Sequence, residues 1–150
     1  MAMDLMERFS IRLMNEKDLK AVMEIDKQVL GETRPDYWKM KFEASKGSGI
    51  APLVAEEKGK VVGFVIGYAS GWEYGVPSDT GWIDTIGVHP KYQKKGIGTI
   101  LVREMIENLK KLGVKRIYTL VNWREWNLLK FFDSLGFRPG DMLNLELKAE

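Results

Sequence analysis

The sequence predicts a mixed α/β domain in which helices pack on one central sheet. Three observations predict it. Segments with a two-residue apolar period alternate with segments of helical period, a hairpin signature lies near the middle, and a glycine-rich turn joins an apolar strand to the most regular helix pattern. With 150 residues, 45% of them hydrophobic, the chain is long enough for one core. We therefore expect a single domain over residues 1–150 and a mixed sheet rather than a doubly wound one.

The first half of the chain is expected to form a strand, two helices and a hairpin. Asn15 with Asp18 three residues later has the spacing of a helix N-cap, and Pro35 suits the first turn of a second helix. Lys58-Gly59-Lys60 between two apolar runs indicates a tight turn. The expected elements are the strand Phe9–Leu13, a helix carrying Leu19, Val22, Met23, Val29 and Leu30, a helix from Pro35 to Gly47, and the strands Pro52–Glu57 and Val61–Ala69.

The second half continues the alternation. The clearest helix pattern is followed by Gly113, a typical C-cap residue, and Asn122 with Glu125 has capping-box spacing before a further helix that ends at Gly136. The expected elements are the strand Trp82–Val88, the helix Gly98–Leu112, the strand Arg116–Val121, a helix carrying Leu128, Phe131, Phe132 and Leu135, and a last strand Met142–Leu147.

Composition excludes several classes of function. The chain has no cysteine, which removes disulfides, thiolate metal sites and a cysteine nucleophile, and its single histidine, His89, makes no zinc site, so no metal is expected. A net charge of +2 with interspersed signs disfavours nucleic acid as a partner. No apolar run approaches membrane-spanning length and the N-terminus lacks a signal-peptide core, so we expect a cytoplasmic protein without membrane contact.

The turn Gln93–Gly98 is the strongest functional signal. A strand that passes through glycines into a helix aims free backbone N–H groups and the positive end of the helix dipole at one point, which suits a phosphate. The pattern G-x-x-x-x-G-K-[ST] is absent, and G-x-G-x-x-G fails because Leu101 stands where its third glycine should be. A glycine turn that binds nothing is the alternative.

Two segments resemble the GNAT superfamily of N-acetyltransferases. GWIDTIGVHPKYQKKGIGTIL at residues 81–101 is similar to its acyl-CoA-binding motif, and FFDSLGF at residues 131–137 is similar to its C-terminal signature. The resemblance implies a mostly antiparallel sheet that splays at the motif strand, about four helices, and acetyl-CoA as co-substrate. It also implies CoA contacts from Ile86, Gly87, Val88, Gln93, Lys94, Lys95, Gly96, Ile97, Gly98, Thr99 and, more weakly, Asn127.

Acetyl transfer to an amine requires a group that removes a proton. Asp84 lies where many relatives carry an acidic residue, and the two-residue period of a strand places it on one face with Ile86 and Val88. A solvated aspartate at a strand end is the alternative. Many relatives have a tyrosine acid at the position of Phe132, so the thiolate either leaves unaided or receives a proton from Tyr74 or Tyr118.

The acceptor site implied by the family lies between the first helices and the loops across the sheet. Asp26 either faces inward to bind a cation or lies at the solvent boundary. The other candidates are Tyr37, Trp38, Trp72, Glu73 and Tyr74, an acidic and aromatic set suited to a cationic amine.

The sequence thus predicts an enzyme that transfers an acetyl group directly from acetyl-CoA to a primary amine, on a small amine, a polyamine or a peptide, within a ternary complex. Direct transfer follows from the absence of cysteine. A non-catalytic acyl-CoA-binding or regulatory module is the alternative, motivated by Phe132. The family's habit and the exposed aromatic residues also suggest a homodimer.

Overall fold

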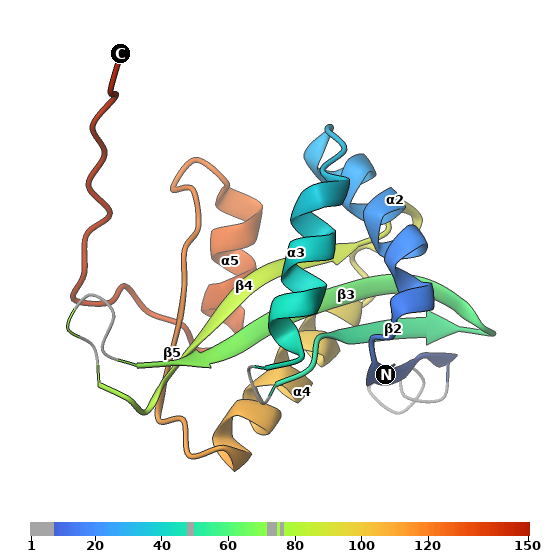
Figure 1. Cartoon of the computed structure of the whole chain (residues 1–150), viewed down its shortest axis with the longest axis horizontal. Coiled ribbons are helices and arrows are strands. Elements are labelled where there is room, and N and C mark those ends of the chain that lie inside the picture. Colours follow the sequence, from blue (N-terminus) through green and yellow to red (C-terminus); the bar gives the residue numbers. More distant parts are fainter. Residues whose placement is uncertain (1–7, 48–49, 72–74, 76) are drawn as a thin grey trace. The chain divides into compact units, whose positions relative to one another are not determined.

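The chain folds into two compact units, residues 1–119 and 120–150, each described by itself. The computed structural model describes residues 8–47, 50–71, 75 and 77–150. In the first unit the strands are β1 (Ser10–Leu13), β2 (Leu53–Glu57), β3 (Lys60–Ser70), β4 (Thr80–Val88) and β5 (Arg116–Thr119). Its helices are α2 (Leu19–Leu30), α3 (Pro35–Ser45) and α4 (Ile97–Lys111), with 3-10 turns η1 (Glu16–Asp18) and η3 (Pro90–Tyr92) (Figure 1).

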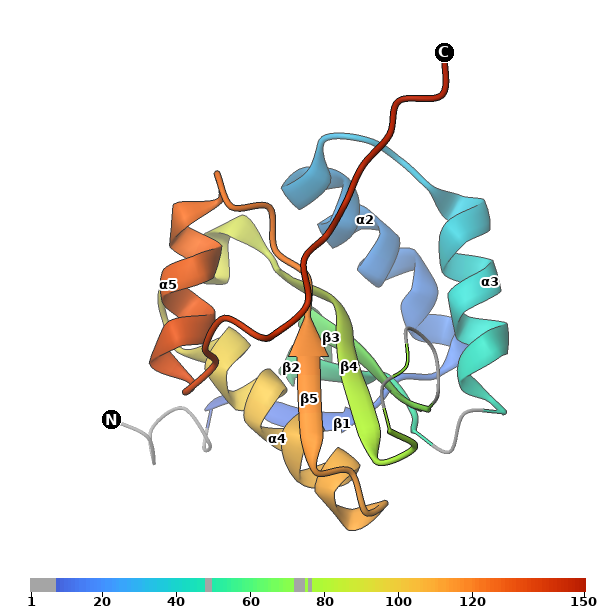
Figure 2. The ribbon, with the colours of Figure 1, turned by 90° about the vertical axis from the view of Figure 1, so that its left-hand side faces the viewer.

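The five strands form one sheet in the order β1-β2-β3-β4-β5. Neighbouring strands from β1 to β4 are antiparallel. β5 runs parallel to β4 and lies beside it (Figure 2). Parallel neighbours need a long crossover, which α4 supplies here. With α5 (Trp126–Ser134) of the second unit, the structure has four α-helices among its described residues and confirms the expected mixed, mostly antiparallel fold.

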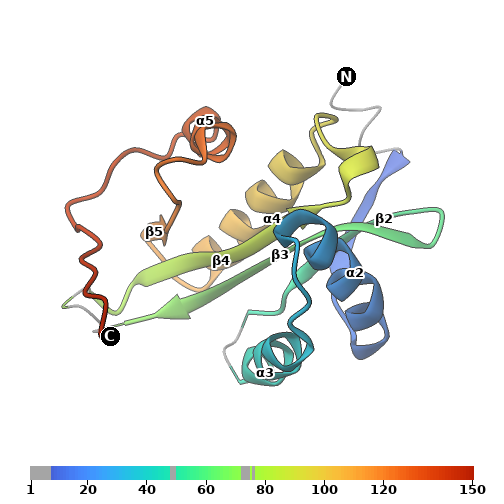
Figure 3. The same ribbon diagram turned by 90° about the horizontal axis from the view of Figure 1, so that it is seen from above.

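Helices cover both faces of the sheet. Figure 3 shows α4 on one face and α2 with α3 on the other. Glycines of β3 and β4 let α4 lie close, since a β-carbon there would come within 3.2 Å of its side chains: Gly63 against Leu101, Gly67 against Met105 and Gly81 against Leu109. On the other face the ring of Phe64 packs edge-on against Trp38, with centroids 4.9 Å apart, beside the buried Val22 and Ile25 of α2.

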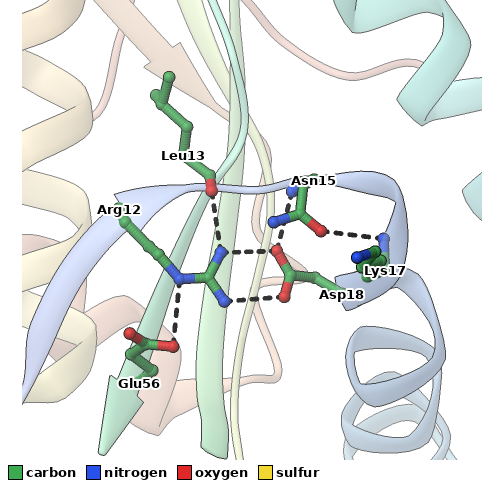
Figure 4. A network of polar contacts seen from close by, with 6 residues as sticks. All are labelled: Arg12, Leu13, Asn15, Lys17, Asp18 and Glu56. Carbon is green, nitrogen blue, oxygen red and sulfur yellow. Dashed lines mark hydrogen bonds and ion pairs between the residues drawn. The ribbon is translucent and has the colours of Figure 1, made fainter. Parts of the chain in front are cut away.

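A polar network attaches the start of α2 to the sheet (Figure 4). The Arg12 guanidinium donates two hydrogen bonds to the buried Asp18 carboxylate, at 2.7 and 2.8 Å, and its Nε lies 3.1 Å from Glu56. Asp18 also accepts the Asn15 N–H, and the Asn15 side chain accepts the N–H of Lys17, which completes the expected capping box. The hydrogen bonds from Arg12 lower the pKa of Asp18 despite its burial.

The second unit contains α5 and an extended C-terminal segment. The ring of Phe132 packs edge-on against Phe131 and Phe137, each with centroids 5.1 Å away. The predicted strand Met142–Leu147 is wrong, because this segment has no ladder partner among the described residues and alternation alone does not make a strand. Its alternating Leu143, Leu145 and Leu147 are 86 to 89% exposed.

Two smaller expectations also need correction. The strand predicted to reach Val121 ends at Thr119 as β5. The predicted capping box before α5 is not formed, because the Asn122 side chain accepts the N–H of Arg124 and closes a local turn instead. The remaining helices and strands agree with the sequence to within a few residues.

Candidate functional site

One extra residue in β4 decides how the side chains of the site point. Along the ladder between β3 and β4, Ile66 pairs with Thr85 and Gly67 pairs with Ile83. Asp84, between these two described pairs, therefore has no residue opposite it. This is a β-bulge, which bends a strand and breaks its two-residue alternation.

After the bulge, the side chains of β4 alternate between the two sheet faces in the opposite phase. Ahead of it, a β-carbon at Gly81 would contact a leucine of α4; beyond it, a β-carbon at Gly87 would lie 2.6 Å from the phenylalanine ring on the opposite face. Ile86 and Val88 alternate with Gly87 and so face α4. The prediction that Asp84 shares their face is wrong, because the extra residue shifts the alternation by one.

Two consecutive residues at the bulge instead contact the same helix, α3. The Asp84 carboxylate forms an ion pair with Lys41, and the Thr85 hydroxyl is hydrogen-bonded to the Tyr37 hydroxyl at 2.8 Å. Thr85 Oγ1 also lies 3.5 Å from Asp84 Oδ1, a long hydrogen bond. Asp84 is thus ion-paired to α3 at a defined place beside β4, although the residue as a whole is exposed.

The Lys41 ammonium lies among an acid and two aromatic rings. Its Nζ pairs with Asp84 and stands 5.7 Å from the ring centroids of both Tyr37 and Tyr68. The side chains of Lys41 and Asp84 are 26% and 21% exposed. Burial by itself lowers the pKa of Lys41, but the hydrogen bond and charge of Asp84 outweigh it, and the pKa is raised. Lys41 is therefore a cation here.

A second ion pair, between Asp26 of α2 and Arg34, lies at the start of α3. Asp26 is 4% exposed and accepts hydrogen bonds from Arg34 at 2.8 and 2.9 Å and from the Trp38 indole at 2.8 Å. The Arg34 guanidinium in turn lies over the Tyr37 ring, 4.1 Å from its centroid. Desolvation raises the pKa of Asp26, yet these hydrogen bonds prevail and the pKa is lowered.

Asp26 thus faces inward, as one of the two expectations had it, but the cation that it binds is Arg34 of the same chain. It does not lie at the solvent boundary, and both of its oxygens already accept hydrogen bonds from the protein's own donors. Its contacts position Arg34 and Trp38, and through Arg34 the ring of Tyr37.

The edge of β4 next to β5 opens just at the bulge. The ladder between these strands extends from Thr80 to Ile83, and the Thr119 hydroxyl donates to the Ile83 carbonyl at its end, at 2.9 Å. From Asp84 onward the described residues provide no strand on this side of β4. The ladder thus ends at the strand where the resemblance implied a splayed sheet, and the backbone at Ile86, Gly87 and Val88 lies along an edge with no strand partner among the described residues.

The turn after β4 leads into the N-terminus of α4. Gln93 folds back, its side-chain amide donating to the Val88 carbonyl at 3.0 Å. Lys94 and Gly96 then adopt left-handed backbone conformations, with φ of 64° and 90°, before the helix starts at Ile97. No side chain of the described chain caps this helix end. The first-turn N–H groups of Ile97, Gly98 and Thr99 have no acceptor within the helix, the arrangement that binds a phosphate.

Positive charge surrounds this turn. The ammonium groups of Lys60 and Lys95 lie 5.7 and 5.4 Å from the ring centroid of Tyr92. His89 accepts the N–H of Lys91 through Nδ1, and burial, followed by the charges of Lys60 and Lys91, lowers its pKa. The histidine is consequently neutral near pH 7, and the lysines supply the charge facing an anion.

The other predicted residues fall into three groups. Tyr118 packs against Trp82 with the two rings tilted by 41° and their centroids 5.2 Å apart, on the sheet face that also carries Asp84. Asn127 lies on α5 in the second unit. The candidates Trp72, Glu73 and Tyr74 lie outside the described residues.

Sequence reasoning missed Lys41, Arg34, Thr85 and Tyr68. Lys41 follows Tyr37 by four residues, a spacing that places both on one face of a helix, and this signal was available. Thr85 was hidden by the assumption of strict alternation.

The described residues contain no group of three or more histidine, aspartate or glutamate side chains able to hold a metal ion. In the same ranges no helix is long and apolar enough to cross a membrane.

Comparison with known proteins agrees with this geometry. The acetyltransferase (GNAT) family model matches residues 19–137. A transcriptional regulator from Bacillus halodurans has the same fold (23% identity, TM-score 0.78, covering 93% of this chain and 99% of that one). The aminoglycoside N-acetyltransferase AAC(6')-Iy in complex with CoA also has this fold (19% identity, TM-score 0.80, covering 94% of this chain and 95% of that one). A ribosomal-protein-alanine N-acetyltransferase from Brucella melitensis has it too (17% identity, TM-score 0.74, covering 95% of this chain and 99% of that one). Since the family model spans the motif strand, the glycine turn and α5, the chain belongs to the acetyltransferase (GNAT) family.

Proposed function

We propose that the protein transfers an acetyl group from acetyl-CoA directly to a primary amine within a ternary complex. The observation that carries this proposal is the placement of Asp84. The bulge in β4 directs this carboxylate toward α3 at the point where the edge of β4 opens, and the open edge leads to the phosphate-binding turn. A proton acceptor and a binding route for the donor therefore meet on one strand.

The donor side fits acetyl-CoA. The first-turn N–H groups of α4 suit the pyrophosphate, with Lys94 and Lys95 adding charge, and the open backbone from Ile86 to Val88 suits the amide groups of the pantetheine arm. An N–H from this stretch is proposed to stabilise the oxyanion formed at the thioester carbonyl, a contribution of about 3 kcal/mol.

The acceptor is proposed to be a cationic amine. Asp84 with the rings of Tyr37 and Tyr68 already surrounds an ammonium group, that of Lys41. Related folds belong to an aminoglycoside N-acetyltransferase and a ribosomal-protein-alanine N-acetyltransferase, so a small amine, a polyamine and a peptide amine are the acceptor classes to test. Trp38 supports Tyr37 in this arrangement, and Trp72 and Glu73 stay candidates for the rim.

The proposed chemistry balances without a covalent intermediate. The free amine attacks the thioester carbonyl carbon, a C–N bond forms, and the C–S bond breaks as CoA leaves as its thiolate. Asp84, directly or through a water, takes the proton that the ammonium must lose. As the amide forms, the nitrogen loses its second proton and the departing thiolate gains one; Tyr118, on the same face of the sheet, is the described candidate for protonating the thiolate.

The test is a panel of primary amines, polyamines and peptides with acetyl-CoA, in which free thiol release is followed together with the mass of the product. Thiol release that depends on the amine, with one acetyl group gained per thiol, supports the enzyme. Binding of CoA with no transfer to any amine favours the rival, a non-catalytic acyl-CoA-binding or regulatory module, which Phe132 in place of a tyrosine motivates.

The last part of the proposed function concerns the oligomeric state of the protein and its place in the cell. We infer a cytoplasmic homodimer that engages neither nucleic acid nor a membrane, and the support for self-association is the row of exposed leucines at the C-terminus. Light scattering that gives a monomer mass at micromolar concentration overturns the dimer.

A further inference from the structure

The amine-binding part of the site is filled by the protein itself. Asp84, Tyr37 and Tyr68, which we call the ammonium site, surround the Nζ of Lys41. A carboxylate with aromatic faces is the chemistry that recognises any primary ammonium. A cationic acceptor would seek the same groups, so Lys41 and the acceptor compete for one place.

Two groups of the ammonium site, Asp84 and Tyr37, are held in place by other parts of the first unit, whereas Lys41 is a flexible occupant. Asp84 is set by the bulge, and Tyr37 is held by the Thr85 hydroxyl on one side and by the Arg34 guanidinium on its ring. Lys41 reaches in from α3 on a flexible four-carbon stem and is 26% exposed, so rotation of that stem carries its ammonium to solvent. Displacement of Lys41 requires no change in the backbone.

We propose that Lys41 is a resident competitor that the acceptor's ammonium must displace from Asp84, which makes Lys41 a residue that determines acceptor specificity. This inference rests on the proposed acetyl transfer and adds to it the place where the acceptor binds. A tethered ammonium acts at an effective concentration on the order of millimolar, so simple monoamines compete poorly while acceptors with further contacts succeed.

The experiment measures binding and turnover of n-butylamine, which reproduces the lysine side chain beyond its α-carbon. Lys41→Met removes the charge and keeps the stem, Lys41→Arg keeps the charge as the matched control, and Lys41→Gln replaces the methionine variant should that one not fold. Saturation-transfer NMR in the presence of CoA gives the dissociation constant of n-butylamine, and thiol release from acetyl-CoA gives its KM and kcat.

We expect the neutral variant to bind n-butylamine at least roughly tenfold more tightly than the wild type, with KM lowered in parallel, since the tethered competitor is gone. Lys41→Arg should resemble the wild type, and adding Asp84→Asn to the neutral variant should abolish the gain. Equal binding by the neutral variant and the wild type, or an equal gain in Lys41→Arg, overturns the inference. Because NMR detects binding without turnover, absence of acetyl transfer in every variant would count against the proposed function alone.

Discussion

The hydroxyl of Thr80, at the start of β4, is fully buried and has no hydrogen-bond partner among the described residues. A buried hydroxyl that loses its hydrogen bond to water destabilises the folded state. A single side chain near the site thus lowers the stability of the strand that carries Asp84.

Replacement of Thr80 by Val should therefore stabilise the protein by about 1 kcal/mol, because the shape is kept and the unpaired hydroxyl is removed. Urea denaturation at neutral pH measures the change in the free energy of unfolding. A loss of stability in Thr80→Val would mean that the hydroxyl has a partner in solution, such as a buried water.

The pair of Asp26 with Arg34 makes stability depend on pH. The pKa of Asp26 is lowered in the folded state, so its contribution is fully present above its unfolded pKa of about 3.9 and is lost as the pH falls through the lower folded value. The free energy of unfolding should decrease steeply below roughly pH 4.

Asp26→Asn should be less stable by about 2 kcal/mol at neutral pH and should show a shallower decrease in acid. Denaturation curves across the acid range test this, and the Asp18 pair, which is intact in the variant, accounts for the slope that remains. An unchanged slope in Asp26→Asn would contradict the assignment.

At the scale of elements, three features of β4 determine the site: the position of its bulge, the end of its ladder with β5, and the turn that connects it to α4. The helices and the hairpin were predictable because their apolar periods are long and regular. The bulge was not, because register is set by pairing with β3 and leaves no mark on the pattern of the strand itself. Lys41 was missed for a related reason, since a lysine on a helix is ordinarily solvated and only the fold brings it to Asp84.

The glycine turn gives a prediction at this scale. Gly96→Val forces a branched side chain into a left-handed backbone, at a cost of about 1 to 3 kcal/mol, and should abolish the rise in melting temperature produced by CoA. Gly113→Val is the matched control, because Gly113 has nearly the same φ, 89°, at the other end of α4 with nothing within 4 Å of its β-carbon position. Equal CoA-dependent shifts in both variants would remove the turn from the donor site.

At the scale of the whole molecule, the family and the donor follow from two motifs, whereas the acceptor does not. Alternation at the C-terminus predicted a strand, but a strand also needs a partner, and the sequence of one chain does not specify it. The proposed acceptor site combines side chains from α3, β3 and β4, so its composition emerges only from the folded first unit. Trp72, Glu73 and Tyr74 stay predictions.

The central claim is that Asp84 removes a proton from the acceptor during acetyl transfer. The most direct measurement compares kcat of Asp84→Asn with the wild type, using the best acceptor of the amine panel, while CoA-induced thermal stabilisation is followed in the same preparations. We predict that kcat falls by roughly 10²- to 10⁴-fold, the range of general base catalysis, and that stabilisation by CoA is unchanged. A variant that turns over as fast as the wild type would contradict the claim.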